Sequence, residues 1–152
     1  MKNKYFFLSR VKAADLNLIF ELSNQKTVRK WSFNKSKIDY ENQKKWFKNI
    51  LNKKNCFFWK FINQSKCYGV IRFEKKHKYY NLSYLISEGR RGHNLGSKMI
   101  IAALKKIVKK KSKIRIQAKS YIKNISSNKT LIKSGFKLKN INKNINCYVY
   151  KK

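Results

Sequence analysis

The chain has 152 residues, 42% of them hydrophobic and 14% aromatic, which is enough for one domain with a substantial core and excludes disorder throughout. Its longest purely apolar run, Met99–Leu104, is far shorter than the roughly 20 residues of a membrane-spanning helix, and no cleavable secretory signal is expected. With 39 Lys and Arg against 6 Asp and Glu, the formal net charge is +33, so negatively charged ligands are attracted.

The basic charge consists mostly of lysine. The chain holds 33 Lys but 6 Arg, together with 17 Asn and 16 Ile. Arginine is the residue that clamps phosphates and reads bases with two hydrogen bonds, so a surface selected for nucleic acid is expected to hold more of it. We therefore favour the codon bias of an AT-rich genome as the source of the lysines. A basic nucleic-acid-binding module stays as an alternative.

The cysteines and histidines have no spacing typical of a metal site. The three cysteines are Cys56, Cys67 and Cys147, and the two histidines, His77 and His93, lie far from each other. We therefore expect a reduced, cytoplasmic protein that binds no metal.

The first third of the chain predicts one strand and two helices. Lys4–Arg10 has the aromatic content of a strand, and Lys12–Ser23 has apolar residues at helical spacing. In Val28–Lys37 the apolar residues follow neither helical nor strand periodicity. Asp39–Asn52 predicts a second helix, which begins with a carboxylate that suits the helix dipole.

The middle third predicts an antiparallel meander followed by a helix. Three runs rich in aromatic and β-branched residues, Cys56–Ile62, Cys67–Glu74 and Tyr79–Ile86, are separated by short polar segments. The segment Leu95–Lys109 then carries one continuous apolar stripe, as in a helix with one buried face.

The last third predicts a strand over Lys113–Lys119 and a helix over Asn124–Ser134 that ends at Gly135. Two strands, Phe136–Lys139 and Cys147–Tyr150, are expected to pair across the residues between them. The predicted fold is thus an α/β (α+β) domain over residues 1–152, in the order β-α-α-β-β-β-α-β-α-β-β. Its central mixed, mostly antiparallel sheet has about seven strands and is flanked by four helices.

The segment Glu88–Ser97 lies between a predicted strand and a strongly amphipathic helix. The start of a helix offers unpaired backbone N–H groups and the positive end of the helix dipole, which together bind anions such as phosphate. The glycine spacing fits neither the nucleotide P-loop nor the dinucleotide fingerprint. The sequence therefore predicts a site for some other phosphate compound.

Within this segment, the run Arg-Gly-His-Asn-Leu-Gly at 91–96 resembles the acetyl-CoA pyrophosphate loop of the GNAT N-acetyltransferase superfamily, Gln/Arg-x-x-Gly-x-Gly/Ala. Asn124 and the ending Lys133–Phe136 resemble the superfamily's Asn-x-x-Ser and Glu-Lys-x-Gly-Phe segment, and the element order is similar over essentially the whole chain. The resemblance implies a single GNAT-like domain that transfers acetyl from acetyl-CoA to an amine. Asn94 stands where the superfamily usually has Gly, and Asn tolerates left-handed backbone angles.

The resemblance also implies which residues bind acetyl-CoA. The pantetheine arm is expected between two splayed strands, with backbone groups of Leu85 and Ile86 beside the thioester and Asn124 near the arm. The implied set is Leu85, Ile86, Arg91, Gly92, His93, Asn94, Leu95, Gly96, Ser97 and Asn124.

The catalytic residues are less clear from the resemblance. Leu131 stands where the superfamily usually has a tyrosine that can protonate the leaving thiolate. Tyr121 is the candidate acid, with Tyr148 and Tyr150 as alternatives, although a thiol of pKa near 8.5 also leaves readily as its anion. Glu74, at a strand end, is the candidate base. The alternative is a strand-end carboxylate that pairs with neighbouring lysines.

A finer resemblance points to the acceptor. The segments Val28–Asn34, Lys45–Phe47 and Gly69–Glu74 are similar to those of acetyltransferases that modify nucleotide-linked amino sugars for bacterial surface glycans, as in pseudaminic acid synthesis. That group often has His where this chain has Gln43, so no role for a histidine is expected there.

The acceptor pocket is expected to use Arg29, Asn34 and Arg72, because a sugar diphosphate needs hydrogen-bond donors. For Arg72, pairing with a carboxylate on a neighbouring strand is equally open. The predicted partners are acetyl-CoA and a small amine, with nucleic acid disfavoured and a homodimer left open. Acetylation of a protein N-terminus or a ribosomal protein is the nearest alternative activity.

Overall fold

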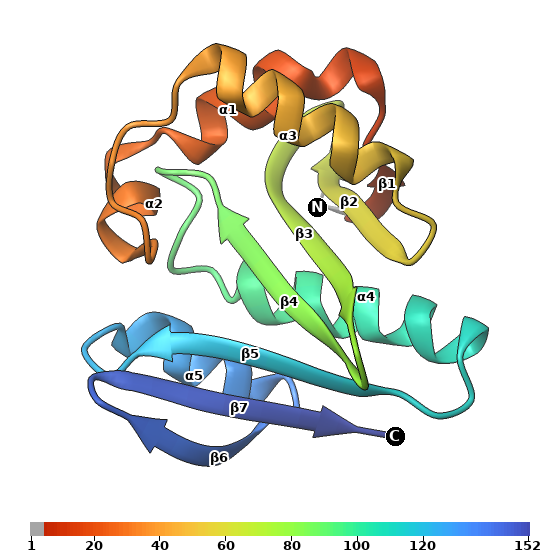
Figure 1. Cartoon of the computed structure of the whole chain (residues 1–152), viewed down its shortest axis with the longest axis vertical. Coiled ribbons are helices and arrows are strands. Elements are labelled where there is room, and N and C mark those ends of the chain that lie inside the picture. The colour runs from red at the N-terminus through yellow and green to blue at the C-terminus, as the bar shows by residue number, and fades with distance from the viewer. Residues whose placement is uncertain (1–4) are drawn as a thin grey trace.

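Seven strands form one mixed sheet in the computed structural model, which describes residues 5–152 (Figure 1). Neighbouring strands are antiparallel except for β4 and β5, which are parallel. This is the mostly antiparallel sheet that the sequence predicts. In spatial order the strands are β1 (Phe7–Arg10), β2 (Cys56–Asn63), β3 (Lys66–Lys76), β4 (Tyr79–Ile86), β5 (Arg115–Tyr121), β7 (Ile145–Lys151) and β6 (Lys137–Asn142).

Helices cover both faces of this sheet. The α-helices are α1 (Leu16–Ser23), α2 (Lys26–Trp31), α3 (Tyr40–Asn52), α4 (Leu95–Lys110) and α5 (Ile125–Lys133), and a 3-10 turn, η1 (Ala13–Asp15), precedes α1. Along β3, Ile71 and Phe73 pack in the core with α4, whereas Val70 packs with α1 and α3 on the opposite face. The alternation of strand side chains therefore divides the apolar residues into two cores.

The structure has one more α-helix than the sequence predicts. The segment without a period contains α2, whose six residues bury Val28 and are too few to display an apolar stripe. The first predicted helix begins as η1 and turns α-helical at Leu16. The first predicted strand is shorter, starting at Phe7, and its expected first residue, Lys4, lies outside the described residues.

The last two strands are longer than predicted. The polar, asparagine-rich segment expected to connect them is itself paired, so that Lys143 and Asn144 alone link β6 to β7. Every residue of β6 is exposed, Leu138 and Ile141 included, so backbone pairing with β7 holds this edge strand in place. Gly135, predicted to end the last helix, follows α5 with a φ of 97°.

The two parallel strands separate shortly after they meet. They pair at Tyr80↔Ile116 and Asn81↔Gln117, and from there β4 continues with β3 while β5 continues with β7. Figure 1 shows β4 and β5 diverging from this point into a V. The opening between them positions the site described below.

Among residues 5–152, no helix is both long enough and apolar enough to pass through a bilayer.

Close approach of β3 to β4 beside this opening requires glycine at position 69. A Cβ atom there would collide with the carbonyl oxygen of Leu85 and lie 2.9 Å from Cδ1 of Ile86. We expect Gly69→Ala to lower the free energy of unfolding by about 1–3 kcal/mol, as overpacking does. Lys66→Ala, at an exposed position of the same strand, serves as the control and stays within about 0.5 kcal/mol. Urea denaturation measures both, and equal midpoints would contradict the steric argument.

Candidate active site

A cavity of about 770 Å³ opens where β4 and β5 separate. It is lined by residues of both strands, by α2 and the residues after it, by the loop before α4, and by α5. On β4, Leu82 and Ile86 belong to the core under α4, while Leu85 packs toward α1 and α3. The cavity therefore passes through the sheet, with one half on the side of α4 and α5 and the other on the side of α2.

The half beside α4 presents free backbone donors. No backbone N–H from Arg91 to Ser97 donates a hydrogen bond to any group within residues 5–152. Asn94, the N-cap of α4, has the left-handed angles φ 56° and ψ 19°, which turn the chain into the helix. Free N–H groups at the positive end of a sixteen-residue helix form an anion site.

The charged side chains that line the cavity are all cationic. They are Arg90, Arg91, Lys119, Lys129 and Lys133. The Arg91 side chain is held by a hydrogen bond from Nε to the carbonyl oxygen of Ile86, 3.3 Å away. No Asp, Glu, His or Cys of the described chain lines the cavity. This electrostatic environment favours a ligand with several negative charges.

The half beside α2 combines aromatic rings with small polar groups. Trp31, Ser32 and Phe33 line it from one side, and Ser83 and Lys119 from the two strands. The ring of Phe33 lies 5.1 Å from that of Tyr121 at the end of β5. The arrangement suits an organic molecule with both a flat group and polar substituents.

The family of the chain follows from comparison with known sequences. The family described as "Acetyltransferase (GNAT) domain" matches residues 6–137, which includes the loop, the diverging strands and α5. The chain belongs to this GNAT acetyltransferase family. It is therefore an acetyl-CoA-dependent N-acetyltransferase, as the loop motif implied. No curated protein matches the sequence significantly.

Solved structures share the fold of this GNAT enzyme. A domain from Methanocaldococcus jannaschii DSM 2661 has a TM-score of 0.86 and 17% identity, over 98% of this chain and 99% of the other. RimL, a ribosomal L7/L12 α-N-protein acetyltransferase in complex with coenzyme A, has a TM-score of 0.82 and 15% identity, over 98% of this chain and 94% of the other. Spermidine N-acetyltransferase from Vibrio cholerae, in complex with coenzyme A and spermine, has a TM-score of 0.81 and 13% identity, over 96% of this chain and 95% of the other.

The structure brings together nearly all residues that the sequence predicts for acetyl-CoA. Every member of that set lines the cavity except His93. His93 instead lines a second hollow, together with Phe6, Tyr68 and Lys98. Asn124 is the N-cap of α5, with its Oδ1 accepting from the backbone N–H of Ser127 at 3.3 Å. Its amide nitrogen donates to no group within residues 5–152 and can face a ligand.

Two of the predicted acceptor residues bind the chain itself. The guanidinium of Arg29 donates to the carbonyl oxygens of Ser23, Asn34 and Ser36 and to the hydroxyl of Ser32. Its pKa is lowered by burial. Neither Arg29 nor Asn34 is part of the cavity lining. Arg29 thus shapes the segment after α2 that presents Trp31 and Phe33, a role that the sequence pattern did not distinguish from substrate binding.

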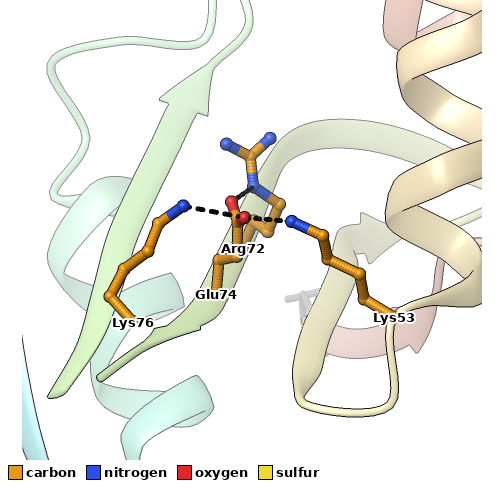
Figure 2. A network of polar contacts seen from close by, with 4 residues as sticks. All are labelled: Lys53, Arg72, Glu74 and Lys76. Atoms are coloured by element: carbon orange, nitrogen blue, oxygen red, sulfur yellow. Dashed lines mark hydrogen bonds and ion pairs between the residues drawn. The ribbon is translucent and has the colours of Figure 1, made fainter. Parts of the chain in front are cut away.

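The third predicted acceptor residue, Arg72, borders the cavity. It lies on β3 directly opposite Ser83, a cavity residue of β4. Its guanidinium is stacked over the ring of Trp46 at 4.8 Å, and its Nε is 3.9 Å from Oε2 of Glu74. Figure 2 shows the two terminal nitrogens of Arg72 directed away from the Glu74 carboxylate. Both readings of Arg72 in the sequence, carboxylate pairing and ligand binding, are compatible with this geometry.

Glu74, the predicted base, lies at the centre of a cluster of cations (Figure 2). Its Oε1 is 2.6 Å from Nζ of Lys53 and 3.0 Å from Nζ of Lys76. Burial raises the pKa of Glu74, but hydrogen bonds from Lys53 and Lys76 and the charge of Arg72 outweigh it and hold the pKa below its ordinary value. Glu74 does not line the cavity, and a carboxylate held in this way has little tendency to accept a proton near neutral pH.

The predicted acid, Tyr121, ends β5 outside the cavity lining, with its ring between Phe33 and Nζ of Lys35. Leu131 is completely buried in the core, so the position of the family's usual tyrosine does not reach a ligand here. The sequence analysis did not select Lys119, Phe33 or Tyr84, which do line the cavity. Strand alternation could have placed Lys119 on the face of β5 opposite the buried Ala118.

The left-handed backbone at Asn94 leads to a test of the anion loop. Asn94→Gly removes the penalty for left-handed angles and should keep both stability and coenzyme A binding. Asn94→Val places a β-branched residue at the same angles, and we expect a loss of about 1–2 kcal/mol in unfolding free energy and weaker coenzyme A binding. Thermal unfolding and titration calorimetry measure the two effects. A valine variant as stable as the glycine variant would contradict the assigned backbone.

The cation cluster around Glu74 predicts a pH dependence of stability. The pKa of Glu74 is lower in the folded protein than its ordinary value of 4.5. The ionised carboxylate therefore stabilises the fold fully at pH values above 4.5, and this contribution is lost as the pH falls through the folded pKa. At about pH 7, we expect Glu74→Gln to cost about 1–3 kcal/mol of unfolding free energy, and the cost to shrink toward pH 3. Denaturation at both pH values measures this.

Glu21→Gln, at an exposed position on α1, is the control for this measurement and is expected to stay within about 0.5 kcal/mol at pH 7. A cost of Glu74→Gln that is equal at both pH values would refute the ion-pair interpretation.

Proposed function

We propose that this enzyme transfers the acetyl group of acetyl-CoA to the amine of a small acceptor that carries phosphate, namely a nucleotide-linked amino sugar. The observation that carries the proposal is the charge of the cavity, which has five Lys and Arg side chains in its lining and no carboxylate from the described residues. A diphosphate matches these cations.

The cations near the acceptor are distinct from those near the coenzyme. Ala118 of β5 belongs to the core under α4, so Lys119 projects to the opposite face, where α2 lies. Arg72 borders the same half from β3. In our proposal the phosphates of the acceptor contact Lys119 and Arg72, and Trp31 and Phe33 provide a surface for the flat nucleobase.

The same charges disfavour polycationic acceptors. A polyamine or aminoglycoside would need carboxylates, and the nearby carboxylate of Glu88 is bound to the backbone N–H and hydroxyl of Thr27, each at 2.8 Å. The pKa of Glu88 is lowered by these hydrogen bonds, so it stays ionised and engaged. This chain is therefore expected to differ in substrate from the spermidine N-acetyltransferase that shares its fold.

A positive cavity also supports the chemistry of an amine nucleophile. The acceptor must lose its ammonium proton before it attacks the thioester, and nearby like charges lower the pKa of an ammonium group. We propose that the amine is kept neutral in this way, without a carboxylate base, and that proton release goes to solvent. The proposal includes a cytoplasmic location, for which the free thiols of Cys56, Cys67 and Cys147 are the support.

The test is acetyl-CoA turnover, measured as free thiol release, over a panel of UDP-, GDP- and CMP-linked amino sugars. The same nucleotides with an already acetylated amine are the matched control. We expect turnover of at least one amino sugar nucleotide and none of the control or of spermidine. Preferred turnover of spermidine would refute the charge argument. Preferred turnover of a peptide N-terminus would favour the protein-acetylating alternative.

Lys119 provides a second test with the acceptor found in that panel. Since a hydrogen bond to a charged group contributes about 1.5–3 kcal/mol, Lys119→Ala should raise KM for the acceptor roughly 10- to 100-fold. KM for acetyl-CoA should change less than about two-fold, because the contact is with the acceptor alone. Lys105→Ala, exposed on α4, is the control that leaves both constants unchanged. Equal effects on both substrates would assign Lys119 to the coenzyme instead.

A further inference from the structure

Acetyl transfer to an amine leaves coenzyme A with a negatively charged sulfur, whatever the acceptor is. The C–S bond breaks with its electron pair on sulfur, and a thiol has an ordinary pKa near 8.5. A proton donor beside the sulfur lowers the barrier, typically by a factor of about 10² to 10⁴. The inference below rests on the acetyl transfer itself and holds for any amine.

Tyr84 is the neutral titratable side chain that lines the cavity in the described chain, where every other titratable lining group is a Lys or Arg. The other tyrosines considered from the sequence do not reach the cavity. Tyr121 lies at the strand end against Phe33, and the hydroxyl of Tyr148 donates to Oδ1 of Asn128 in a buried network. Tyr84 on β4 is therefore the tyrosine whose side chain lines the cavity.

The position of Tyr84 is set by its neighbours on two helices, α4 and α5. Its hydroxyl lies 2.8 Å from the hydroxyl of Ser127 in the first turn of α5, so it spans the gap between β4 and that helix. Its ring lies beneath the start of α4, where a Cβ on Gly96 would come 3.8 Å from Cε2 of Tyr84 and 3.0 Å from Cγ2 of Thr130. The side chain thus has a fixed direction, with its hydroxyl held between the anion loop and the N-terminus of α5.

The protonation state suits a donor. Burial raises the pKa of Tyr84, and hydrogen bonding with Ser127 and Thr130 acts in the opposite direction without cancelling it. The phenol is therefore protonated at neutral pH. Leu85, whose backbone is expected beside the thioester, is the next residue along β4. The Tyr84 ring packs against the core under α4, so the hydroxyl lies in the half of the cavity that contains the anion loop, where the coenzyme is expected.

We propose that Tyr84 is the catalytic acid that protonates the departing sulfur of coenzyme A, with the Ser127 hydroxyl holding the phenol in position. The amine nitrogen forms a bond to the acetyl carbon, and the C–S bond breaks with its electrons going to sulfur. Sulfur takes the proton of the Tyr84 hydroxyl. The phenolate then receives the proton that the nitrogen has lost, through Ser127 and solvent, so that tyrosine is restored.

The experiment compares Tyr84→Phe with Tyr80→Phe. Tyr80 lies on the same strand and the same face, in the core outside the cavity lining, so its variant removes a hydroxyl without touching the site. With the amine that is best turned over in the acceptor panel, we expect Tyr84→Phe to lower kcat about 100-fold and to change KM for acetyl-CoA less than two-fold. Tyr80→Phe keeps the kcat of the original enzyme.

A binding measurement supplies a second readout that does not need the acceptor. Titration calorimetry compares coenzyme A with desulfo-coenzyme A, which lacks the sulfur. The original enzyme should prefer coenzyme A about five-fold or more, as one hydrogen bond predicts, and Tyr84→Phe should bind the two equally. A merely structural role of Tyr84 would weaken both ligands alike.

The outcomes separate this proposal from the acceptor proposal. Unchanged kcat in Tyr84→Phe, or the same preference for coenzyme A in both proteins, overturns the role of Tyr84. If no amino sugar nucleotide is turned over, the acceptor proposal fails, and the binding comparison still decides on Tyr84. Should Tyr84→Phe fail to fold, Ser127→Ala replaces it. That variant is expected to lower kcat about 10-fold with KM for acetyl-CoA unchanged, and an unaltered kcat overturns the proposal.

Discussion

The separation of β4 from β5 is the constraint on which the site depends. The two strands pair over only two residues each, after which β4 follows β3 as far as the pair Gly69↔Ile86 and β5 follows β7 to Tyr121. The core under α4 includes residues from both halves of the sheet, Ile71 on one side and Ile116 on the other, so this core holds the halves at a set distance. Backbone groups on the two facing edges lack a strand partner beyond Asn81 and Gln117. They remain available to a ligand that carries amides of its own, as a pantetheine arm does.

The shortage of carboxylates gives the cavity its electrostatic character. Of the six Asp and Glu, several are engaged with the chain itself: Asp15 with Lys60, Asp39 as the cap of α3, Glu74 with Lys53 and Lys76, and Glu88 with Thr27. The cations in the cavity are thus left without an acidic neighbour in its lining. One electrostatic fact then has two chemical consequences, attraction of phosphate and a lowered pKa for an acceptor ammonium. Whatever produced the lysine excess over the rest of the surface, inside the cavity it is suited to the reaction.

The residues of the coenzyme loop were predictable because their role resides in the backbone. A glycine-containing loop before an amphipathic helix presents N–H groups whatever the distant parts of the chain do, and the free donors from Arg91 to Ser97 agree with that expectation. Side-chain roles were less predictable, because they depend on partners far away in sequence. Arg29 has a suitable residue type for phosphate, yet four acceptors in its own neighbourhood already use its donors. Glu74 likewise has the chemistry of a base until Lys53, brought close by the β2–β3 pairing, and Lys76 are placed beside it.

The sequence by itself determined the order and type of most elements and the turn into α4, because hydrophobic periodicity acts over a few residues. The coenzyme was implied by the resemblance of residues 91–96 to the GNAT loop. The six-residue helix α2 was not predicted, because it is too short to display an apolar stripe, and β6 was predicted too short, because pairing with β7 extends it beyond Lys139. Only the tertiary structure decided which side chains share the cavity. In the fold Leu131 is buried, Glu74 pairs with lysine side chains, and the hydroxyl of Tyr84 on β4 lies within hydrogen-bond distance of Ser127 on α5. The reason is physical: a side chain's chemistry is set by its residue type, but its access to a ligand is set by whatever the fold packs around it.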